Sequence, residues 1–495
     1  MKMAERPEVN QFSSNSLPRR SALLPAMLTV LCAGAAILWA ASRVTSGNYR
    51  DLLVAALLGQ VVWVVARWRE SVYAFMVYVI IEGFLINYFS GFSALNLVKD
   101  AFVVVLFTVM ATILILRHTS PIPRMSWLLP FGAFAVIYLA EMFNPALPSI
   151  LVGLVGARVT LLYFLLVPVA YWFFENRARV LQFFVFMVTL SIPVSLFGIL
   201  QYLKGPQWML AMSPGFEKAV FYAFGSEAND EARYFRTFST FVHTGGFSQY
   251  LAFIMLVTLA LWAVPAMQRR RIWITFALLI QFLAQLTTGG RTSLILFGIA
   301  VVMVLILQRG SLKLAPLLAL FPIVLAGTVG VFGTGFVERY SSVLDVEYVR
   351  GRNMPLLTGW IKESMKADWV GLGAGYATVA SRHIGVTPLN TVVVENGLAR
   401  MRFEAGLPGF VLYVVFVLSL MLYCLRQAMA VRDIQTRWFS SACATFLIVT
   451  LAAVIFGNPF DTSPTNVYIW FFAGFLARAP LLDEALTAEK LSEIG

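Results

Sequence analysis

Arginine residues gather in two long polar segments of a chain that is otherwise strongly apolar. The first segment contains Arg233 and Arg236, and the second contains Arg339, Arg350, Arg352, Arg382, Arg400 and Arg402. A guanidinium group stays charged at physiological pH and binds phosphate or carboxylate through two parallel hydrogen bonds. As a set, these residues indicate an anionic substrate, whereas any one of them could instead contact lipid headgroups.

Another arginine occupies a tight turn between two apolar runs. Arg291 lies in the sequence TTGGRTS at 287–293. Glycine lets the backbone bend sharply and approach a ligand closely, and the first amides of the helix expected after the turn favour an anion. We therefore predict that Arg291 binds an anionic group. The alternative is an interfacial arginine that extends its charge to the headgroups.

Four other charged residues fall in or beside apolar runs. Arg158 begins one run, and Glu82 lies well inside another. Charges within a membrane are costly and are functional or paired by default, so a structural ion pair of Glu82 with an arginine is an equal alternative. Glu395 and Glu404 precede a later run, where a carboxylate could accept a proton from a substrate hydroxyl or pair with an arginine.

Metal and cofactor chemistry has little support in the sequence. The three cysteines, Cys32, Cys424 and Cys443, lie in apolar runs and read as small core residues. No Cys/His cluster has the spacing of a zinc site, and Asp345 with Glu347 is only a weak candidate for a divalent cation. We expect neither a metal nor a cofactor.

Membrane-spanning helices must position these residues, because the composition excludes a water-soluble protein. Hydrophobic residues make up 59% of the chain and charged residues 13%, about half the fraction usual in soluble domains. Fourteen apolar runs approach the length of roughly 17–25 residues that a bilayer requires. They lie near 22–42, 52–66, 71–90, 99–116, 126–142, 157–174, 180–203, 238–264, 272–288, 292–307, 313–333, 406–426, 438–456 and 466–478. The predicted fold is an all-α bundle of about 14 transmembrane helices.

The net charge of +12 reflects membrane orientation and does not indicate nucleic-acid binding. With a cytoplasmic N-terminus, 20 basic residues fall in the inner connections and tails, whereas Arg43, Arg50, Lys99 and Arg291 fall in short outer ones. Positive residues favour the cytoplasmic side. The first run is longer than a signal peptide needs, so we expect an uncleaved anchor.

This orientation divides the chain into seven parts. We expect a cytoplasmic tail at 1–20, helices 1–7 at 21–203, a periplasmic loop at 204–237, helices 8–11 at 238–333, a large periplasmic catalytic loop at 334–405, helices 12–14 at 406–478 and a cytoplasmic tail at 479–495. Loops as long as the second are usually functional or disordered, and its tryptophans and tyrosines argue against disorder.

Four stretches, taken in order, resemble the motifs of a known family. They are GILQY at 198–202, RTF at 236–238, TGGR at 288–291, and a final series with Trp360, Gly371, Gly373, Gly375, Asn396, Leu398, Glu404, Gly406 and Gly409. Together they resemble the O-antigen ligase and polymerase superfamily, bacterial membrane glycosyltransferases that act on undecaprenyl-diphosphate-linked glycans. The glycine usual between Arg236 and Thr237 is missing, and Gly290 stands where serine is common.

The resemblance implies a GT-C-like bundle in the bacterial inner membrane that carries out metal-independent, inverting transfer at its periplasmic face. Arg236 and Arg291 would bind the diphosphate and stabilise its departure, with Arg158 and Arg339 as further binders by position. Glu395 stands where ligases carry a histidine. This favours polymerisation of repeat units, with Glu395 as the residue that handles the acceptor hydroxyl.

Two alternatives stay open. A ligase would move a finished lipid-linked glycan to another acceptor. A lipid-linked oligosaccharide flippase would instead place charges along a central path in both halves. For a polymerase, the expected partners are the lipid-linked oligosaccharide as donor and acceptor, the bilayer, a chain-length regulator and a flippase, with no nucleic acid.

Overall fold

The computed structural model describes residues 61–89, 95–120, 122–224, 235–308, 369–378 and 396–494, together with Gly59 and Tyr340. Glu395, Arg339 and the runs expected at 22–42 and 313–333 lie outside the described residues, as does most of 52–66. The chain divides into a unit of Met1–Val62 and a unit of Trp63–Gly495. The elements of the candidate site all belong to the second unit.

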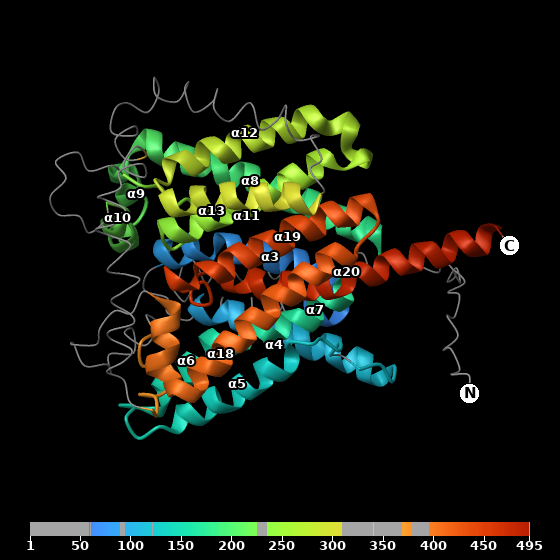
Figure 1. The fold of residues 1–495 in the computed structure, drawn as a ribbon. Helices are drawn as coiled ribbons and strands as arrows, with labels where there is room; N and C mark the ends of the chain where they lie inside the picture. The colour runs from blue at the N-terminus through green and yellow to red at the C-terminus, as the bar shows by residue number, and fades with distance from the viewer. Residues whose placement is uncertain are drawn as a thin grey trace, which may run out of the picture. The chain divides into compact units, whose positions relative to one another are not determined.

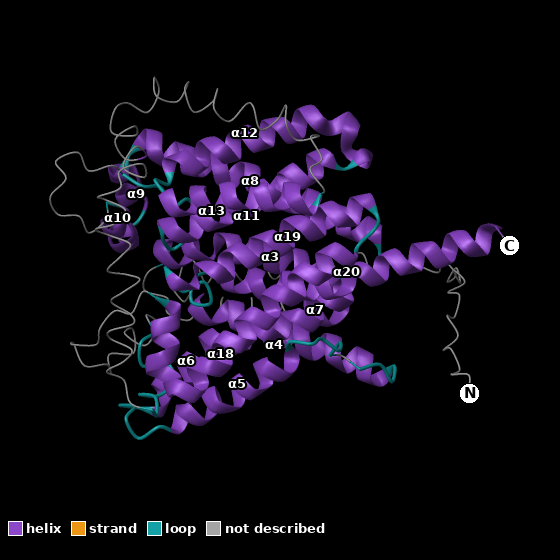
Figure 2. Cartoon of the chain, in the orientation of Figure 1, coloured by secondary structure: helices purple, strands orange, loops and turns teal. Residues whose placement is uncertain are grey.

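Every regular element in the described part of the chain is a helix (Figure 2). The α-helices are α3 (Trp68–Tyr88), α4 (Leu95–Leu116), α5 (Leu128–Ala140), α6 (Ile150–Leu161), α7 (Leu166–Phe173), α8 (Arg177–Lys204), α9 (Pro206–Met212), α10 (Glu217–Ala223), α11 (Thr244–Ala263), α12 (Arg271–Thr287), α13 (Arg291–Leu307), α18 (Gly397–Ala430), α19 (Ile434–Ala452) and α20 (Thr465–Ile494). Among the described residues, seven helical stretches are long and apolar enough to cross a membrane. The fold is that of a multi-pass helical membrane protein.

Helix α11 forms the centre of one half of the second unit. It contacts α8, α12, α13 and α19, and nearly all of its residues from Phe247 to Ala263 are buried. A helix that is apolar on every side is either enclosed by other helices or faces lipid, and the burial of α11 shows that it is enclosed. On the other side of α19 and α20, α18 packs against α5, and α7 packs against α20. The long helices run side by side in Figure 1.

Three helices begin at different residues from those expected, in each case at a side chain that caps the helix. Helix α6 begins after Ser149, whose Oγ accepts a hydrogen bond from an amide of the first turn. Helix α11 begins six residues later than expected, after His243. Helix α18 begins nine residues earlier than expected, after Asn396. An N-cap side chain satisfies amides that would otherwise lack partners, and apolar content alone does not locate it.

The predicted motif residues that are described gather at one end of this bundle, which we call the motif end. Here α3 ends and α4, α11, α13 and α18 begin. It lies on the left in Figure 1, opposite the C-terminal end of α20.

Candidate functional site

Gln201, from the GILQY stretch, fixes the RTF stretch to the end of α8. The Gln201 side chain is fully buried. Its Nε2 donates to Ser239 O at 3.0 Å, and its Oε1 accepts from Ser239 N at 2.7 Å and from Phe238 N at 3.3 Å. Ser239 has φ +50, a left-handed conformation in the segment that precedes α11. Two motifs that are well separated in sequence therefore form one local structure.

Arg236 stands at the start of this structure and contacts the end of α10. Its Nε donates to Ala223 O at 3.0 Å and its Nη2 donates to Tyr222 O at 2.8 Å. A cation near the last carbonyls of a helix is favourable. The guanidinium is only partly buried, so Arg236 combines a structural contact with access to the surface.

The turn that carries Arg291 lies beside the same structure. Thr237 N donates to Thr287 O at 3.1 Å, and the hydroxyls of these two threonines are 2.8 Å apart. The turn uses Gly289 at φ +59, and Gly290 lies so close to α11 that an added Cβ would be 2.9 Å from Ser248 Cβ. Arg291 is partly buried at the first turn of α13. The structure thus brings the segments of Arg236 and Arg291 together.

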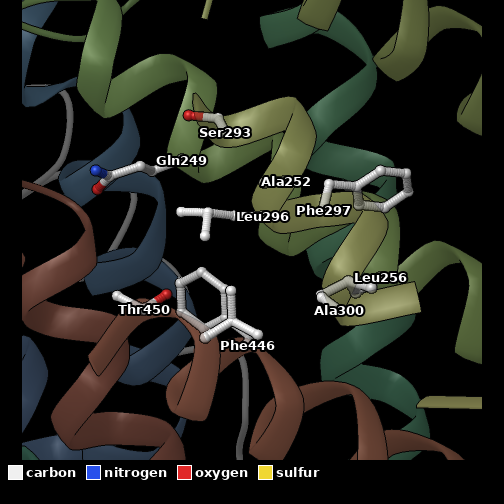
Figure 3. A pocket seen from close by; sticks show the side chains of 10 residues that line it. Gln249, Ala252, Leu256, Ser293, Leu296, Phe297, Ala300, Phe446 and Thr450 are labelled. Atoms are coloured by element: carbon white, nitrogen blue, oxygen red, sulfur yellow. The ribbon is translucent and has the colours of Figure 1, made fainter. Parts of the chain in front are cut away.

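A pocket opens along α13 below this turn, between α11, α13 and α19 (Figure 3). Gln249, Ser293 and Thr450 lie toward one side of it, and Leu256 and Ala300 lie toward the other. Its remaining lining is apolar and consists of Ala252, Leu296, Phe297, Phe446 and Val449. The pocket therefore changes from polar near the motif end to apolar within the bundle.

The carboxylate of Glu82 is buried in an ion pair, but its partner is a lysine. Lys99 Nζ lies 2.8 Å from Glu82 Oε2, and both side chains are less than a tenth exposed. Ser463, in the connection between α19 and α20, donates to the same oxygen at 3.2 Å. Lys99 lies within α4 and not in an outer connection as expected, because its charge is neutralised there. Glu82 is thus a structural partner.

Arg158 is also held by an acidic residue. Its Nε lies 2.5 Å from Asp100 Oδ2, and the hydroxyl of Tyr163 donates to Asp100 Oδ1 at 2.7 Å. Arg158 lies in the third turn of α6 rather than at the start of a span, and its side chain is 29% exposed. The carboxylate of Asp100 therefore anchors Arg158.

Among the described residues, the most deeply buried charges are Arg400 and Glu404, on successive turns of α18. Arg400 Nε donates to Glu404 Oε1 at 3.0 Å, and both side chains are at most 1% exposed. Arg400 Nη1 lies 3.5 Å from Asp461 Oδ2. Neither buried residue can touch a substrate in this arrangement. Glu404 is the salt-bridge partner that the sequence left as one of two alternatives.

The glycine-rich stretch 371–375 packs against this pair. Gly371 lies so close to α18 that an added Cβ would be 2.2 Å from Glu404 O, and Gly375 would meet Val152 O at 2.3 Å. Gly373 and Gly375 have φ +102 and +79, where other residues are disfavoured. These glycines serve close packing against α18 and α6, so residues of the final series form a second local structure.

Sequence reasoning missed the residues that satisfy these charges. Tyr138, Thr160 and Asp461 contact the Arg400–Glu404 pair from α5, α6 and the α19–α20 connection. None stands in a recognisable pattern, and Tyr138 is 266 residues away from Glu404. Asp100, the partner of Arg158, is the one of these residues with a sequence signal. It follows Lys99 at the start of an apolar run, and charges placed there need partners.

Comparison with known proteins adds no family to this picture. A search finds no family model and no curated protein that matches the chain.

Proposed function

We propose that this chain is a membrane glycosyltransferase that polymerises undecaprenyl-diphosphate-linked oligosaccharide repeat units into a surface polysaccharide. One observation supports it above the others. Stretches that resemble the superfamily's motifs are far apart in sequence, yet they make direct contacts at one end of the bundle. Gln201 bonds the RTF stretch, Thr237 pairs with the threonine four residues before Arg291, and the glycine stretch packs on Glu404.

In the proposed reaction, an acceptor sugar hydroxyl attacks the anomeric carbon of the donor from the face opposite the diphosphate. The new glycosidic C–O bond forms as the bond to the diphosphate oxygen breaks, which inverts the anomeric centre. The hydroxyl proton passes to Glu395, and the leaving diphosphate takes the electron pair. Arg236 and Arg291 stabilise this developing charge, with Arg158 and Arg339 as further contacts.

The pocket beside α13 suits the lipid part of such a donor. Arg291 lies two residues before Ser293, which lines the polar side of the pocket. A diphosphate bound at Arg291 would leave the first isoprene units near Leu296 and Ala300. The apolar lining matches the lipid part of a lipid diphosphate, and the polar side faces the turn of Arg291.

The membrane topology belongs to the same proposal. Fourteen spans with cytoplasmic termini would place the motif end on the periplasmic side of the bacterial inner membrane. A reporter fused after Arg270 would then be cytoplasmic, and one inserted near Lys366 would be periplasmic. The opposite result at either site would contradict the topology.

The two alternatives differ from the proposal in specific ways. A flippase should line a central path with charges, whereas the five buried charged residues of the described chain all lie at the motif end: Glu82, Lys99, Asp100, Arg400 and Glu404. A ligase would use the same diphosphate chemistry with another acceptor. Glu395 in place of histidine is the residue that favours polymerase over ligase.

Purified protein with defined lipid-linked repeat units tests the proposal. We expect wild-type protein to make chains and Glu395→Gln to bind the donor but lose elongation by about 10²–10⁴-fold, because the amide cannot take the proton. Chain length on a gel is the measurement. A wild-type protein that makes no chains contradicts the proposed activity, and a fully active Glu395→Gln variant contradicts the role of that residue.

A further inference from the structure

We infer that Glu404 is a positioning residue whose buried carboxylate holds the segment 369–378 against a break in α18 and so fixes the start of that helix. The effect on turnover rests on the proposed function, but the contacts do not. The argument starts from the hydrogen bonds of the carboxylate.

Both oxygens of Glu404 accept hydrogen bonds from different parts of the chain. Oε1 accepts from Arg400 Nε at 3.0 Å, Thr378 Oγ1 at 2.9 Å and Ala377 N at 3.1 Å. Oε2 accepts from the hydroxyl of Tyr138 at 2.5 Å. A carboxylate is an acceptor only, so it suits four donors. One side chain thereby joins α18, α5 and the segment 369–378.

The segment 369–378 also replaces backbone hydrogen bonds that α18 lacks. Gly406 has φ +64 and ψ −168, which breaks the helix. Beside the break, Leu372 N donates to Phe403 O at 2.7 Å and Gly373 N to Glu404 O at 3.1 Å, while Leu407 N donates to Trp369 O at 3.0 Å. Buried backbone groups must find partners. The break is therefore stable only while this segment stays in place.

Arg400 extends the same network to the other side. Its Nη2 donates to Thr160 Oγ1 at 3.3 Å, and Thr160 Oγ1 donates to the hydroxyl of Tyr138 at 3.2 Å. The first turn of α18, which follows the N-cap residue Asn396, is thus tied to α5 and α6 through Arg400 and Glu404. Catalytic groups need support that locks them to a fraction of an ångström. Asn396 directly follows Glu395 in the chain, so this support acts next to the proposed base.

Tyr138 offers a substitution that removes one hydroxyl, and Tyr413 offers a matched control. Both side chains are buried, and both lie near Arg400. Within the described residues, the hydroxyl of Tyr413 makes no hydrogen bond. Tyr138→Phe removes a donor to Glu404. Tyr413→Phe removes an oxygen that takes no part in the hydrogen bonds of Glu404, which we call the clamp.

The experiment measures hydrogen exchange of the peptide 369–378 and elongation kinetics in wild type, Tyr138→Phe, Glu404→Gln and Tyr413→Phe. In Tyr138→Phe and Glu404→Gln, we expect hydrogen exchange at Ala377 and its neighbours to become faster by on the order of tenfold. Turnover should fall by about 10- to 100-fold with an unchanged donor KM, because small displacements of reacting groups are costly. Tyr413→Phe should match wild type in both.

The two readouts separate this inference from the proposed function. Wild-type exchange in Glu404→Gln overturns the inference, whatever the activity. Faster exchange with normal turnover also overturns it, because the clamp would then be structural only. If exchange rises in the variants as expected but the wild-type protein makes no chains, the contacts of Glu404 hold the segment 369–378 as inferred, and the proposed polymerase activity is wrong.

Discussion

The two sides of the motif end bury their motif charges to different depths. On the α8–α11–α13 side, Arg236 and Arg291 are partly buried, and the side chain of Gln201 makes buried hydrogen bonds to the chain beside them. On the α4–α6–α18 side, Arg400 and Glu404 are sealed from solvent and satisfy one another. Both sides contain residues of the four motif stretches.

This difference separates two uses of charge that sequence alone does not distinguish. A charge that stays partly exposed lies where a ligand can reach it. A charge that is buried with a partner fixes backbone segments, and its removal leaves the partner uncompensated. An arginine in a motif of this chain is therefore a ligand-binding candidate only where its guanidinium reaches the surface.

The largest expected effect concerns stability on the α4–α6–α18 side. Arg400→Leu leaves Glu404 buried without its cation, and we expect a loss of about 3–5 kcal/mol in the free energy of unfolding. Arg69→Leu is the matched control, because its pair with Glu175 is more than a third exposed on both sides. That change should cost only about 0–1 kcal/mol. Unfolding in detergent micelles is the measurement, and equal losses would contradict the comparison.

The next effect concerns activity on the α8–α11–α13 side. Arg291→Lys keeps the charge but loses the planar fork, and we expect elongation to slow by about a hundredfold, or about 3 kcal/mol in the transition state. Unfolding should be unchanged. Arg269→Lys, at an exposed arginine of the opposite end, is the control. A lysine variant at 291 that elongates at the wild-type rate would remove Arg291 from the site.

A smaller effect tests whether neutral contacts support Arg236. Gln201→Leu leaves the amides of Phe238 and Ser239 without their acceptor, at a cost of about 1–3 kcal/mol in stability. Turnover should fall with it, because the RTF stretch loses its anchor. Gln268→Leu, at an exposed glutamine, should change neither quantity. Normal stability in the Gln201 variant would show that the anchor is dispensable.

The smallest effect tests the pocket. Ala300→Leu fills apolar space that we assign to the lipid chain, and we expect the donor KM to rise about fivefold, equivalent to about 1 kcal/mol. Gly298→Leu adds similar bulk on the same helix where an added Cβ meets nothing within 4 Å. It should leave KM unchanged. Equal KM values for the two variants would place the lipid elsewhere.

Much of the helical architecture could be predicted from the sequence. The all-helical membrane class is confirmed for the described residues, and apolar runs such as 180–203 and 272–288 correspond to α8 and α12 within a few residues. Apolar length is a local property of the chain, so it needs no tertiary information. The count of 14 spans stays a prediction.

The partners of the buried charges could not be predicted in the same way. For Glu82 the sequence left a functional role and an ion pair with an arginine as equal alternatives, and the structure shows an ion pair with Lys99 of the next helix. Tyr138 reaches Glu404 across most of the chain. Such contacts depend on which helix faces pack together, and in a helix apolar on all sides the sequence pattern does not mark a face.

The break at Gly406 divides α18 into two halves whose buried faces are not in one helical register. Before it, Gly397, Ala399, Arg400 and Met401 are all buried by protein. After it, Val411, Val415, Leu418 and Leu422 are exposed at intervals of three and four residues, which is one stripe along a helix. Lipid-accessible labels scanned along α18 should therefore show helical periodicity only beyond Gly406. Because the contacts of Arg400, Glu404 and the segment 369–378 hold the first half and the break in place, deleting one residue between Gly406 and Val411 would rotate this stripe by about 100°, away from the acyl chains and toward α5 or α19.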